Sequence, residues 1–191
     1  TENGAPDLAM LDADTVRRME PQVNAIAALH SPATGILDAH ALCLSFAAEA
    51  EAHGAALALG REVVGIESAR PGYRVIAQSA SGERESLDAA AVVNAAGLAS
   101  DHVAALAGID VDARNLRQHP CKGDYFALAP GAPLHFEQLV YPVPAGAGLG
   151  VHVTLDLGGR VRFGPDAEYV DRIDYAVDPG KAERFASAAQ R

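Results

Sequence analysis

The sequence predicts a mixed α/β and α+β chain, with alternating strands and helices first and an antiparallel sheet afterwards. Three observations support this. Residues 92–97 read Val-Val-Asn-Ala-Ala-Gly, which predicts a buried strand ending in a small-residue turn before a helix. Leu42, Phe46 and Ala50 are spaced four apart, as on one face of a helix. Beyond about residue 117, alternating apolar and polar residues are interrupted by glycine and proline loops, which favours antiparallel strands.

Two helices are predicted in the first part of the chain. Asp12 is a suitable N-cap for a short helix to about Met19, which ends at Glu20 before a proline. An irregular loop is expected from there to residue 37. Asp38 then caps a longer helix, and Gly54 ends it.

A small β-meander is predicted between two apolar strands. Residues 56–59 and 91–94 have the apolar composition of buried strands in a parallel sheet. Between them, turn signals at Pro-Gly and Ser-Gly separate three antiparallel strands. These are expected over residues 62–69, 73–79 and 84–87. A helix is predicted over residues 100–107.

The second half predicts an antiparallel sheet closed by a helix over residues 179–189. Its strands are expected over residues 117–128, 138–142, 149–157 and 160–163. Residues 146–150, Gly-Ala-Gly-Leu-Gly, have their third glycine one position too early for a dinucleotide-binding turn, and a strand pattern follows. We interpret them as a hairpin loop.

Composition limits the classes of function. The 191 residues are 49% hydrophobic and 21% charged, enough for one sizeable core or a domain with a small lobe. With 25 acidic and 15 basic residues the formal charge is −10, which argues against a nucleic-acid partner or an anionic membrane surface. The two cysteines are far apart, and the histidines lack metal-ligand spacing, so no metal site is expected. No apolar run is long enough for a transmembrane segment.

On the residues alone, the turn at 94–97 fits close passage of a ligand and a plain tight turn equally well. Three further segments occur with it in order: Thr-Gly-Ile-Leu-Asp at 34–38, Lys-Gly-Asp-Tyr-Phe at 122–126, and Tyr-Pro-Val-Pro at 141–144, leading through Gly-Val-His-Val-Thr to Gly-Pro-Asp-Ala-Glu at 164–168. Together they resemble the D-amino-acid-oxidase-like superfamily of FAD-dependent oxidoreductases, most of all its L-2-hydroxyglutarate oxidase and dehydrogenase branch. The resemblance covers about residues 11–170.

The resemblance implies the middle part of a longer flavoenzyme. The family's opening Gly-x-Gly-x-x-Gly turn and its closing glycine-rich segment are not found in this sequence. Residues 38–109 would be a portion of the Rossmann-like FAD-binding domain with an inserted meander. Residues 1–37 and 110–191 would form the substrate-binding lobe and flanking helices. The implied activity is oxidation of a small 2-hydroxy acid by hydride transfer to FAD, in a cytoplasmic or membrane-peripheral enzyme.

His152 is the candidate catalytic base. It stands mid-strand between two valines, so its side chain points away from theirs, and an imidazole titrates near physiological pH. A strand histidine with a hydrogen-bond partner is the alternative. The resemblance also suggests Lys122, Tyr125 and Tyr141 as substrate contacts, each of which could instead be a sheet or surface residue. His119, two residues from Arg117 on a predicted strand, could add positive potential to one face and is the fourth candidate for substrate binding.

Four positions are candidates for cofactor binding by resemblance. Ala96 and Gly97 form the small-residue turn, and Gly123 follows the lysine of the second motif. Val63 falls where the family contacts the adenine end through its backbone, although a plain core role fits it equally.

Alternative functions remain open at this level. The parent protein could oxidise an amine or amino acid with the same flavin, or the piece alone could be an inactive fragment or binding module. A small anionic substrate is expected, and the electron acceptor could be oxygen or a quinone. The sequence contains no Gly-x-Ser-x-Gly turn, so no motif in it favours a hydrolase. The acidic run from Asp166 to Asp174 is interpreted as solvated turns and strand ends.

Overall fold

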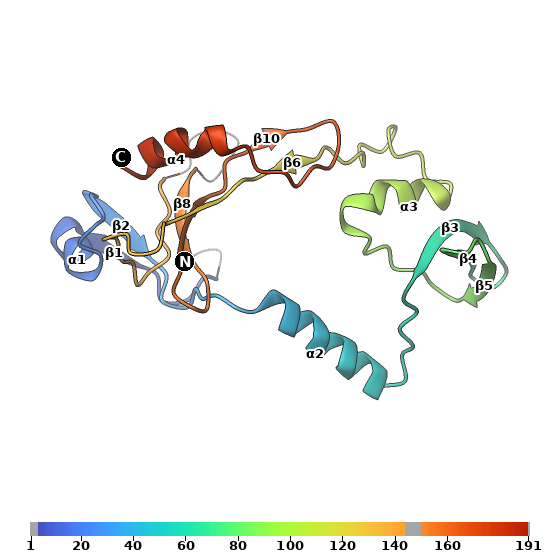
Figure 1. The fold of residues 1–191 in the computed structure, drawn as a ribbon. Coiled ribbons are helices and arrows are strands. Elements are labelled where there is room, and N and C mark those ends of the chain that lie inside the picture. Colours follow the sequence, from blue (N-terminus) through green and yellow to red (C-terminus); the bar gives the residue numbers. More distant parts are fainter. Residues whose placement is uncertain (1–3, 144–149, 191) are drawn as a thin grey trace. The chain divides into compact units, whose positions relative to one another are not determined.

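The computed structural model describes residues 4–143 and 150–190. The chain divides into two compact units. Unit 1 comprises Thr1–Cys43 and Cys121–Arg191, and unit 2 comprises Leu44–Pro120. Each unit is described by itself, in ribbon form in Figure 1.

Unit 1 begins with a hairpin that encloses a helix. Strand β1 (Ala9–Asp12) pairs antiparallel with β2 (Ala27–His30), and α1 (Ala13–Met19) follows β1 directly. The Asp12 carboxylate accepts a hydrogen bond from the Thr15 amide at 2.8 Å, so the predicted cap is confirmed. The expectation of a loop up to residue 37 is wrong, because β2 lies within it. Its Ala-Ala-Leu-His sequence lacks the β-branched and aromatic residues that mark a strand.

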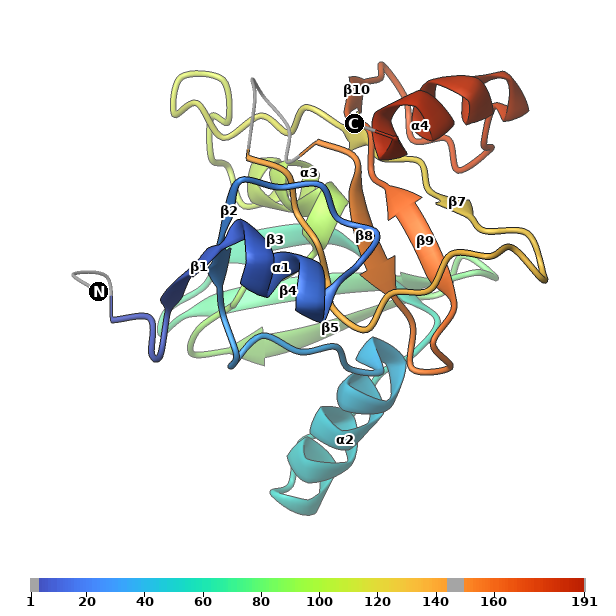
Figure 2. The same ribbon diagram turned by 90° about the vertical axis from the view of Figure 1, so that its left-hand side faces the viewer.

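The core of unit 1 lies against a three-stranded antiparallel sheet in the order β7 (Phe126–Ala127), β9 (Val161–Gly164), β8 (His152–Leu155). Figure 2 shows β8 and β9 side by side. Alternate residues on one face of this sheet enter the core, as the period-two pattern predicts. The buried core residues are Phe136, Val153, Val161, Phe163 and Phe185.

The predicted long strand over residues 117–128 is wrong. Only β6 (Cys121–Lys122) and β7 are strands, and β6 pairs with β10 (Glu168–Tyr169) whereas β7 pairs with β9. The chain leaves one sheet and joins another through residues 123–125, which interrupts the ladder. The expected strand 138–142 is reduced to a single bridge between Val140 and Val153. The predicted glycine hairpin loop falls mostly outside the described residues.

The C-terminal helix forms as predicted. A short 3-10 turn, η2 (Pro179–Lys181), leads into α4 (Ala182–Ala189), and the Asp178 side chain caps it by accepting from the Gly180 amide at 2.8 Å. Phe185 is 2% exposed and lies 4.7 Å, centroid to centroid, from the ring of Phe126. This contact holds α4 on the sheet.

Unit 2 contains the predicted meander. Strands β3 (Arg61–Ser68), β4 (Tyr73–Ser79) and β5 (Arg84–Ala89) pair antiparallel in sequence order. After them come η1 (Gly97–Ala99) and α3 (Ser100–Leu106), the latter close to its predicted position. In Figure 1 the meander and α3 form the right-hand part of the drawing.

The two buried strands predicted for unit 2 are not formed. Residues 56–59 and 91–94 have no regular structure, and Val93 is 89% exposed. A strand is stabilised by hydrogen bonds to a neighbour, and neither segment has a strand partner in the described parts of the chain. The structure is therefore mixed α/β with antiparallel sheets, and a Rossmann-like arrangement stays a prediction.

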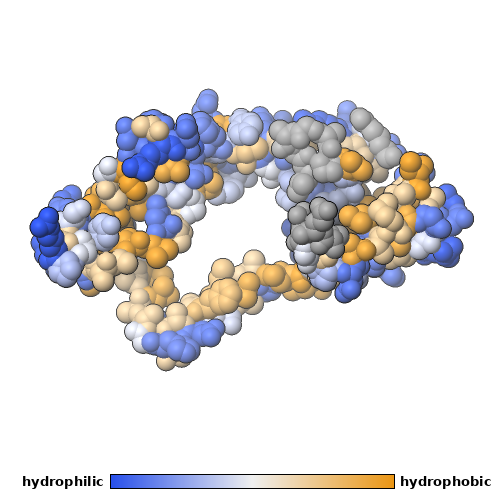
Figure 3. Space-filling view, turned by 180° about the vertical axis from the view of Figure 1, so that it is seen from behind, coloured by the Kyte–Doolittle hydropathy of each residue, from blue (hydrophilic) through white to orange (hydrophobic). Residues whose placement is uncertain are grey.

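Helix α2 (Ala39–Ala52) begins and ends as predicted. The Asp38 carboxylate accepts from the Ala41 amide at 2.9 Å, and Gly54 has φ +90° just past the end. None of its residues is buried. Figure 3 shows apolar side chains along its surface. Within the described ranges, no helix is long and apolar enough to cross a bilayer.

Candidate active site

His152 begins strand β8 and is 6% exposed. It faces Gly164 across the β8–β9 ladder, while the neighbouring pair Val153 and Phe163 is buried in the core. The imidazole therefore projects from the opposite face of the sheet, here called the His152 face. Its Nδ1 lies 3.2 Å from the carbonyl oxygen of Gly150.

Two predicted tyrosines enclose the imidazole. The ring of Tyr141 stacks on it at a centroid distance of 4.3 Å and an interplanar angle of 25°. The ring of Tyr125 meets it edge-on at 6.4 Å and 84°. Burial raises the pKa of Tyr125, and the nearby Tyr141 adds to the rise while Arg162 opposes it. The structure thus brings together three of the residues proposed from sequence.

Gly164 fixes the position of Tyr125. Its φ of +142° lies in a region that side-chain-bearing residues rarely adopt, and a Cβ there would lie 2.8 Å from Tyr125 Cδ1 and 2.6 Å from the Asp124 carbonyl oxygen. The chain can bring Tyr125 over this strand only because position 164 has no side chain. Gly164 stands in one of the motifs quoted for the resemblance, but no pattern in the sequence indicates this role.

Lys122, predicted to anchor substrate, is engaged within unit 1. Its ammonium donates a hydrogen bond to the carbonyl oxygen of Ala176 and lies 3.8 Å from Asp124 Oδ1. Gly123 beside it has its own packing requirement, because a Cβ would lie 2.6 Å from Pro165 Cβ.

A buried ion cluster lies next to Lys122. Lys181 Nζ is 2.6 Å from Asp124 Oδ2, 3.1 Å from Asp166 Oδ2 and 2.8 Å from Glu168 Oε2. Hydrogen bonds to these carboxylates raise the pKa of Lys181. Burial alone would raise the pKa of Asp166, but the Asp124 amide and Lys181 together lower it. The interpretation of Asp166 as solvated is wrong: it is 7% exposed.

The remaining predicted residues lie in unit 2. Gly97 has φ +56°, is exposed, and has open space where a Cβ would be. Ala96 beside it is also exposed, and its amide donates to Asn94 Oδ1 at 3.3 Å. Val63 is partly buried where the β3–β4 register shifts, and His119 is exposed. His119 thus belongs to a different unit from His152.

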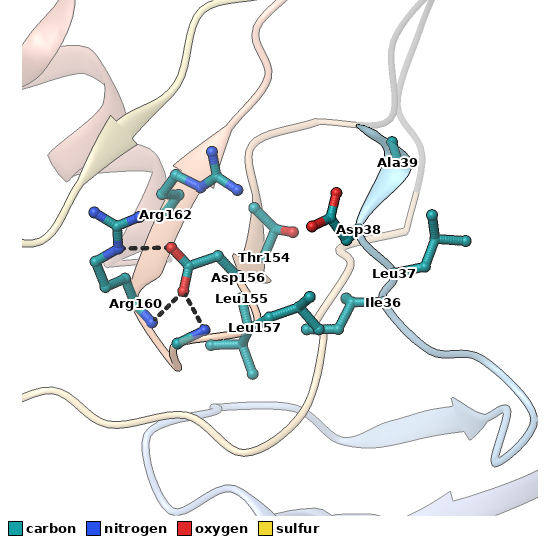
Figure 4. A pocket seen from close by; sticks show the side chains of 11 residues that line it. Ile36, Leu37, Asp38, Ala39, Thr154, Leu155, Asp156, Leu157, Arg160 and Arg162 are labelled. Carbon is teal, nitrogen blue, oxygen red and sulfur yellow. Dashed lines mark hydrogen bonds and ion pairs between the residues drawn. The ribbon is translucent and has the colours of Figure 1, made fainter. Parts of the chain in front are cut away.

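A cavity of about 540 Å³ that sequence reasoning missed opens in unit 1. Thr154 and Arg162 of the His152 face contribute to its lining, and Figure 4 shows its residues. The periodicity of 151–155 could have placed Thr154 on this face. The full lining is Ile36, Leu37, Asp38, Ala39, Thr154, Leu155, Asp156, Leu157, Gly158, Arg160 and Arg162. In the described part of the chain, no group of three His, Cys, Asp or Glu could hold a metal ion.

Several curated proteins are similar in sequence. The chain is 33% identical over 222 residues to the mitochondrial L-2-hydroxyglutarate dehydrogenase of Arabidopsis thaliana, covering 97% of this chain and 46% of that protein. It is 32% identical to the human enzyme of the same name, over 87% of this chain and 37% of that protein. It is 31% identical to glycerol 3-phosphate dehydrogenase of Caloramator mitchellensis, over 91% and 34% respectively. The chain spans less than half the length of these relatives.

Solved structures show the same fold. L-alpha-glycerophosphate oxidase from Mycoplasma pneumoniae, with FAD bound, matches with a TM-score of 0.75 and 24% identity, over 96% of this chain and 48% of that one. Glycine oxidase from Geobacillus kaustophilus matches with a TM-score of 0.72 and 23% identity, over 99% and 47%. A model of the DAO family, described as FAD dependent oxidoreductase, matches residues 1–191. The chain therefore belongs to the DAO family of FAD-dependent oxidoreductases, whose cofactor is FAD.

Proposed function

We propose that the protein carrying this chain oxidises a small 2-hydroxy acid of the L-2-hydroxyglutarate kind by hydride transfer to FAD. The observation that carries the proposal is the placement of His152, nearly buried on a strand between two tyrosine rings. The names of the curated relatives that are 32–33% identical support this substrate class.

His152 is set up to accept a proton at Nε2. A carbonyl oxygen can only accept, so the contact with Gly150 requires that Nδ1 carry the hydrogen. Nε2 then keeps its lone pair, and it has no hydrogen-bond partner among the residues described. In the proposed reaction Nε2 takes the hydroxyl proton of the substrate as the hydride leaves its α-carbon.

The tyrosines supply positioning. The stacked ring of Tyr141 restricts rotation of the imidazole. Tyr125 and Tyr141 are 42% and 50% exposed, and their hydroxyls can hydrogen-bond to a substrate oxygen. Lys122 stays a proposed substrate contact, although its ammonium is held by Ala176 and Asp124.

The residues of unit 2 fit a flat prosthetic group. The Ala96–Gly97 turn is exposed and open at the position of a Cβ, so a ligand can approach its backbone closely. When bound, FAD supplies the hydride acceptor. We propose Ala96, Gly97 and the backbone of Val63 as its contacts, within a cofactor-binding part at residues 38–109. Gly123 remains a predicted cofactor contact and His119 a predicted substrate contact. Residues 1–37 and 110–191 remain the predicted substrate-binding lobe.

The test is anaerobic reduction of the flavin in the full-length protein. Loss of the oxidised-flavin absorbance is expected with L-2-hydroxyglutarate and not with glycine, sarcosine or D-alanine. Bleaching by an amine alone would contradict the proposed substrate.

Glycerol 3-phosphate is the second candidate substrate, because a relative 31% identical is a glycerol 3-phosphate dehydrogenase. Testing glycerol 3-phosphate in the same flavin-reduction experiment shows whether the anionic group of the substrate is a carboxylate or a phosphate ester.

A further inference from the structure

Arg162 is a cation without an ion partner on the His152 face. No carboxylate of the described residues lies within ion-pair distance of it. Among the described residues of unit 1, Arg18 and Arg172 are also without an ion partner, but Arg18 donates to the Thr15 hydroxyl within α1 and Arg172 lies in the irregular loop after β10. The described basic side chains of unit 1 that do have carboxylate partners are Arg17, Lys122, Arg160, Lys181 and Arg184.

The β8–β9 register places Arg162 beside the histidine. Arg162 faces Thr154, and the adjacent pair on the same face is His152 with Gly164. His152 and Arg162 are therefore diagonal neighbours, which in an antiparallel pair lie about 7–8 Å apart. The charge of Arg162 also acts on Tyr125, where it opposes the burial-driven rise in the pKa of the phenol. The guanidinium is thus within electrostatic reach of the ring that covers His152.

No carboxylate of the described residues that line the cavity forms an ion pair with Arg162. Two carboxylates line this cavity, and both are engaged elsewhere. Asp38 accepts from the Ala41 amide at 2.9 Å, and Asp156 accepts from Arg160 Nε at 2.6 Å. Figure 4 shows the bonds of Asp156 to Arg160 and to the turn, with Thr154 and Arg162 rising from the neighbouring strands. An anion entering here meets the unpaired Arg162 guanidinium and the Thr154 hydroxyl, while Asp38, whose side chain accepts only from a neutral amide, keeps its negative charge at the start of α2.

We propose that Arg162, together with Thr154, forms a subsite for the far carboxylate of a dicarboxylic 2-hydroxy acid whose hydroxyl end lies at His152. This rests on the proposed function. A guanidinium binds a carboxylate through two parallel hydrogen bonds, which fixes both the position and the direction of the substrate. The diagonal spacing suits a substrate whose second charge lies several carbons beyond the reacting carbon. Arg162 thereby selects dicarboxylates over monocarboxylates of similar length.

The experiment compares Arg162→Gln with Arg172→Gln, a matched exposed and unpaired arginine, in the full-length flavoprotein. Two readouts are taken: kcat/KM for L-2-hydroxyglutarate and for L-2-hydroxyvalerate, and calorimetric binding of glutarate, which has no hydroxyl to oxidise. Arg162→Gln is expected to lower kcat/KM for the dicarboxylate and the affinity for glutarate by about 10- to 100-fold. The monocarboxylate should change less than about 3-fold, and Arg172→Gln should change nothing. Arg162→Lys keeps the positive charge but cannot form the two parallel hydrogen bonds of a guanidinium. It should lose less kcat/KM and affinity than Arg162→Gln, and it provides the test if the glutamine variant does not fold.

Equal losses on both acids, or no loss on either, would overturn the subsite. Wild-type protein that binds glycerol 3-phosphate in place of glutarate would also overturn it. A different result would contradict the proposed function. If no 2-hydroxy acid bleaches the flavin but glutarate binds with an affinity that depends on Arg162, the subsite is supported and the proposed reaction is not.

Discussion

Gly164 shows how much the candidate site depends on one residue without a side chain. It combines a positive φ with contacts to the Asp124 carbonyl and the Tyr125 ring that leave no room for a Cβ. Its partner across the ladder is His152. Gly164, which has no side chain, therefore determines the position of Tyr125 relative to the His152 imidazole.

We predict that Gly164→Ala lowers the free energy of unfolding by about 2–5 kcal/mol, because backbone strain and overpacking add. Gly159→Ala is the control: its φ is +74° but no atom lies within 4 Å of the added Cβ, so only the strain of about 1–2 kcal/mol applies. Urea unfolding of both variants measures the difference. Equal losses would show that the Tyr125 contact has no energetic weight.

His152→Gln is expected to lower kcat for 2-hydroxy acid oxidation by about 10²- to 10⁴-fold, as for the loss of a general base. Glutamine keeps a polar side chain of similar reach but cannot accept the proton. His135→Gln is the control, since the His135 side chain is 79% exposed. Stopped-flow reduction of the flavin measures the hydride step itself. A rate within a few-fold of wild type would remove His152 from the mechanism.

At this scale the sequence identified side chains that meet in the structure but did not predict all of their contacts. His152, Tyr125 and Tyr141 were proposed from motifs, and they meet in the structure. Lys122 is predicted to contact substrate, yet its ammonium is held within the unit. Strand periodicity shows which face of a sheet a residue occupies. It does not show which of several basic side chains forms an ion pair, because ion pairs join residues far apart in the chain.

Ion pairs add to packing and strand pairing among the elements around the ion cluster. Lys181, where η2 ends, meets carboxylates from the 123–125 connection and from the segment around β10. Asp124 and Asp166 are also linked directly, the Asp124 amide donating to Asp166 Oδ1 at 2.9 Å. Removal of the lysine would leave two nearly buried carboxylates with only the more distant cations Lys122 and Arg184, each at 3.8 Å.

Lys181→Met is predicted to lower the free energy of unfolding by about 3–5 kcal/mol, the usual cost of breaking a buried pair from one side. In the control, Arg184→Met, the lost side chain is 66% exposed and 3.8 Å from Asp166, so less than about 1 kcal/mol is expected. Thermal unfolding distinguishes the two. Similar shifts in Tm would mean that Lys181 contributes no more than a surface charge.

The same cluster predicts a pH window for stability. The folded-state pKa of Asp166 lies below its ordinary value of 3.8, so its contribution is present above that pH and is lost as the pH falls further. The pKa of Lys181 is raised above 10.5, so its contribution is present below that pH and is lost as the pH rises through the folded-state value. The contribution of Asp166 and Lys181 to stability should be constant between these limits and decline outside them, as unfolding midpoints measured across pH would show. In Lys181→Met the alkaline decline should be smaller.

Element prediction succeeded where the signal was local. The caps at Asp12 and Asp38 and the turns of the meander act within four residues of one another, and these elements form as predicted. The strands at 56–59 and 91–94 failed because an apolar run forms a strand only beside another strand. The break at 123–125 was missed because it depends on which sheet each half joins.

For the whole molecule, exposed apolar surface is the dominant feature. Helix α2 buries no residue, and Leu44 and Phe46 are 58% and 60% exposed. Elsewhere Ile26 and Val93 are 94% and 89% exposed. Large exposed apolar side chains in such numbers are typical of surfaces that bind other protein segments.

The 191-residue chain on its own is therefore predicted to bind an apolar fluorescent dye and to self-associate with rising concentration. Replacement of Leu44 and Phe46 by serine should reduce both effects, whereas replacement of the exposed Glu49 and Glu51 by glutamine should not. Dye titration and sedimentation velocity provide the measurements. A monomeric chain that binds no dye would contradict the prediction.

The switch of the chain between two sheets at residues 123–125 has a consequence for mutational tolerance. Asp124 belongs to the ion cluster and Tyr125 to the aromatic enclosure of His152, and a single peptide bond separates them. Substitutions at Lys181 and at Tyr125 will then not add, although the two side chains belong to different assemblies. Selection on either assembly restricts the sequences open to the other, so the charged end of the C-terminal helix and the histidine site are expected to evolve as one unit.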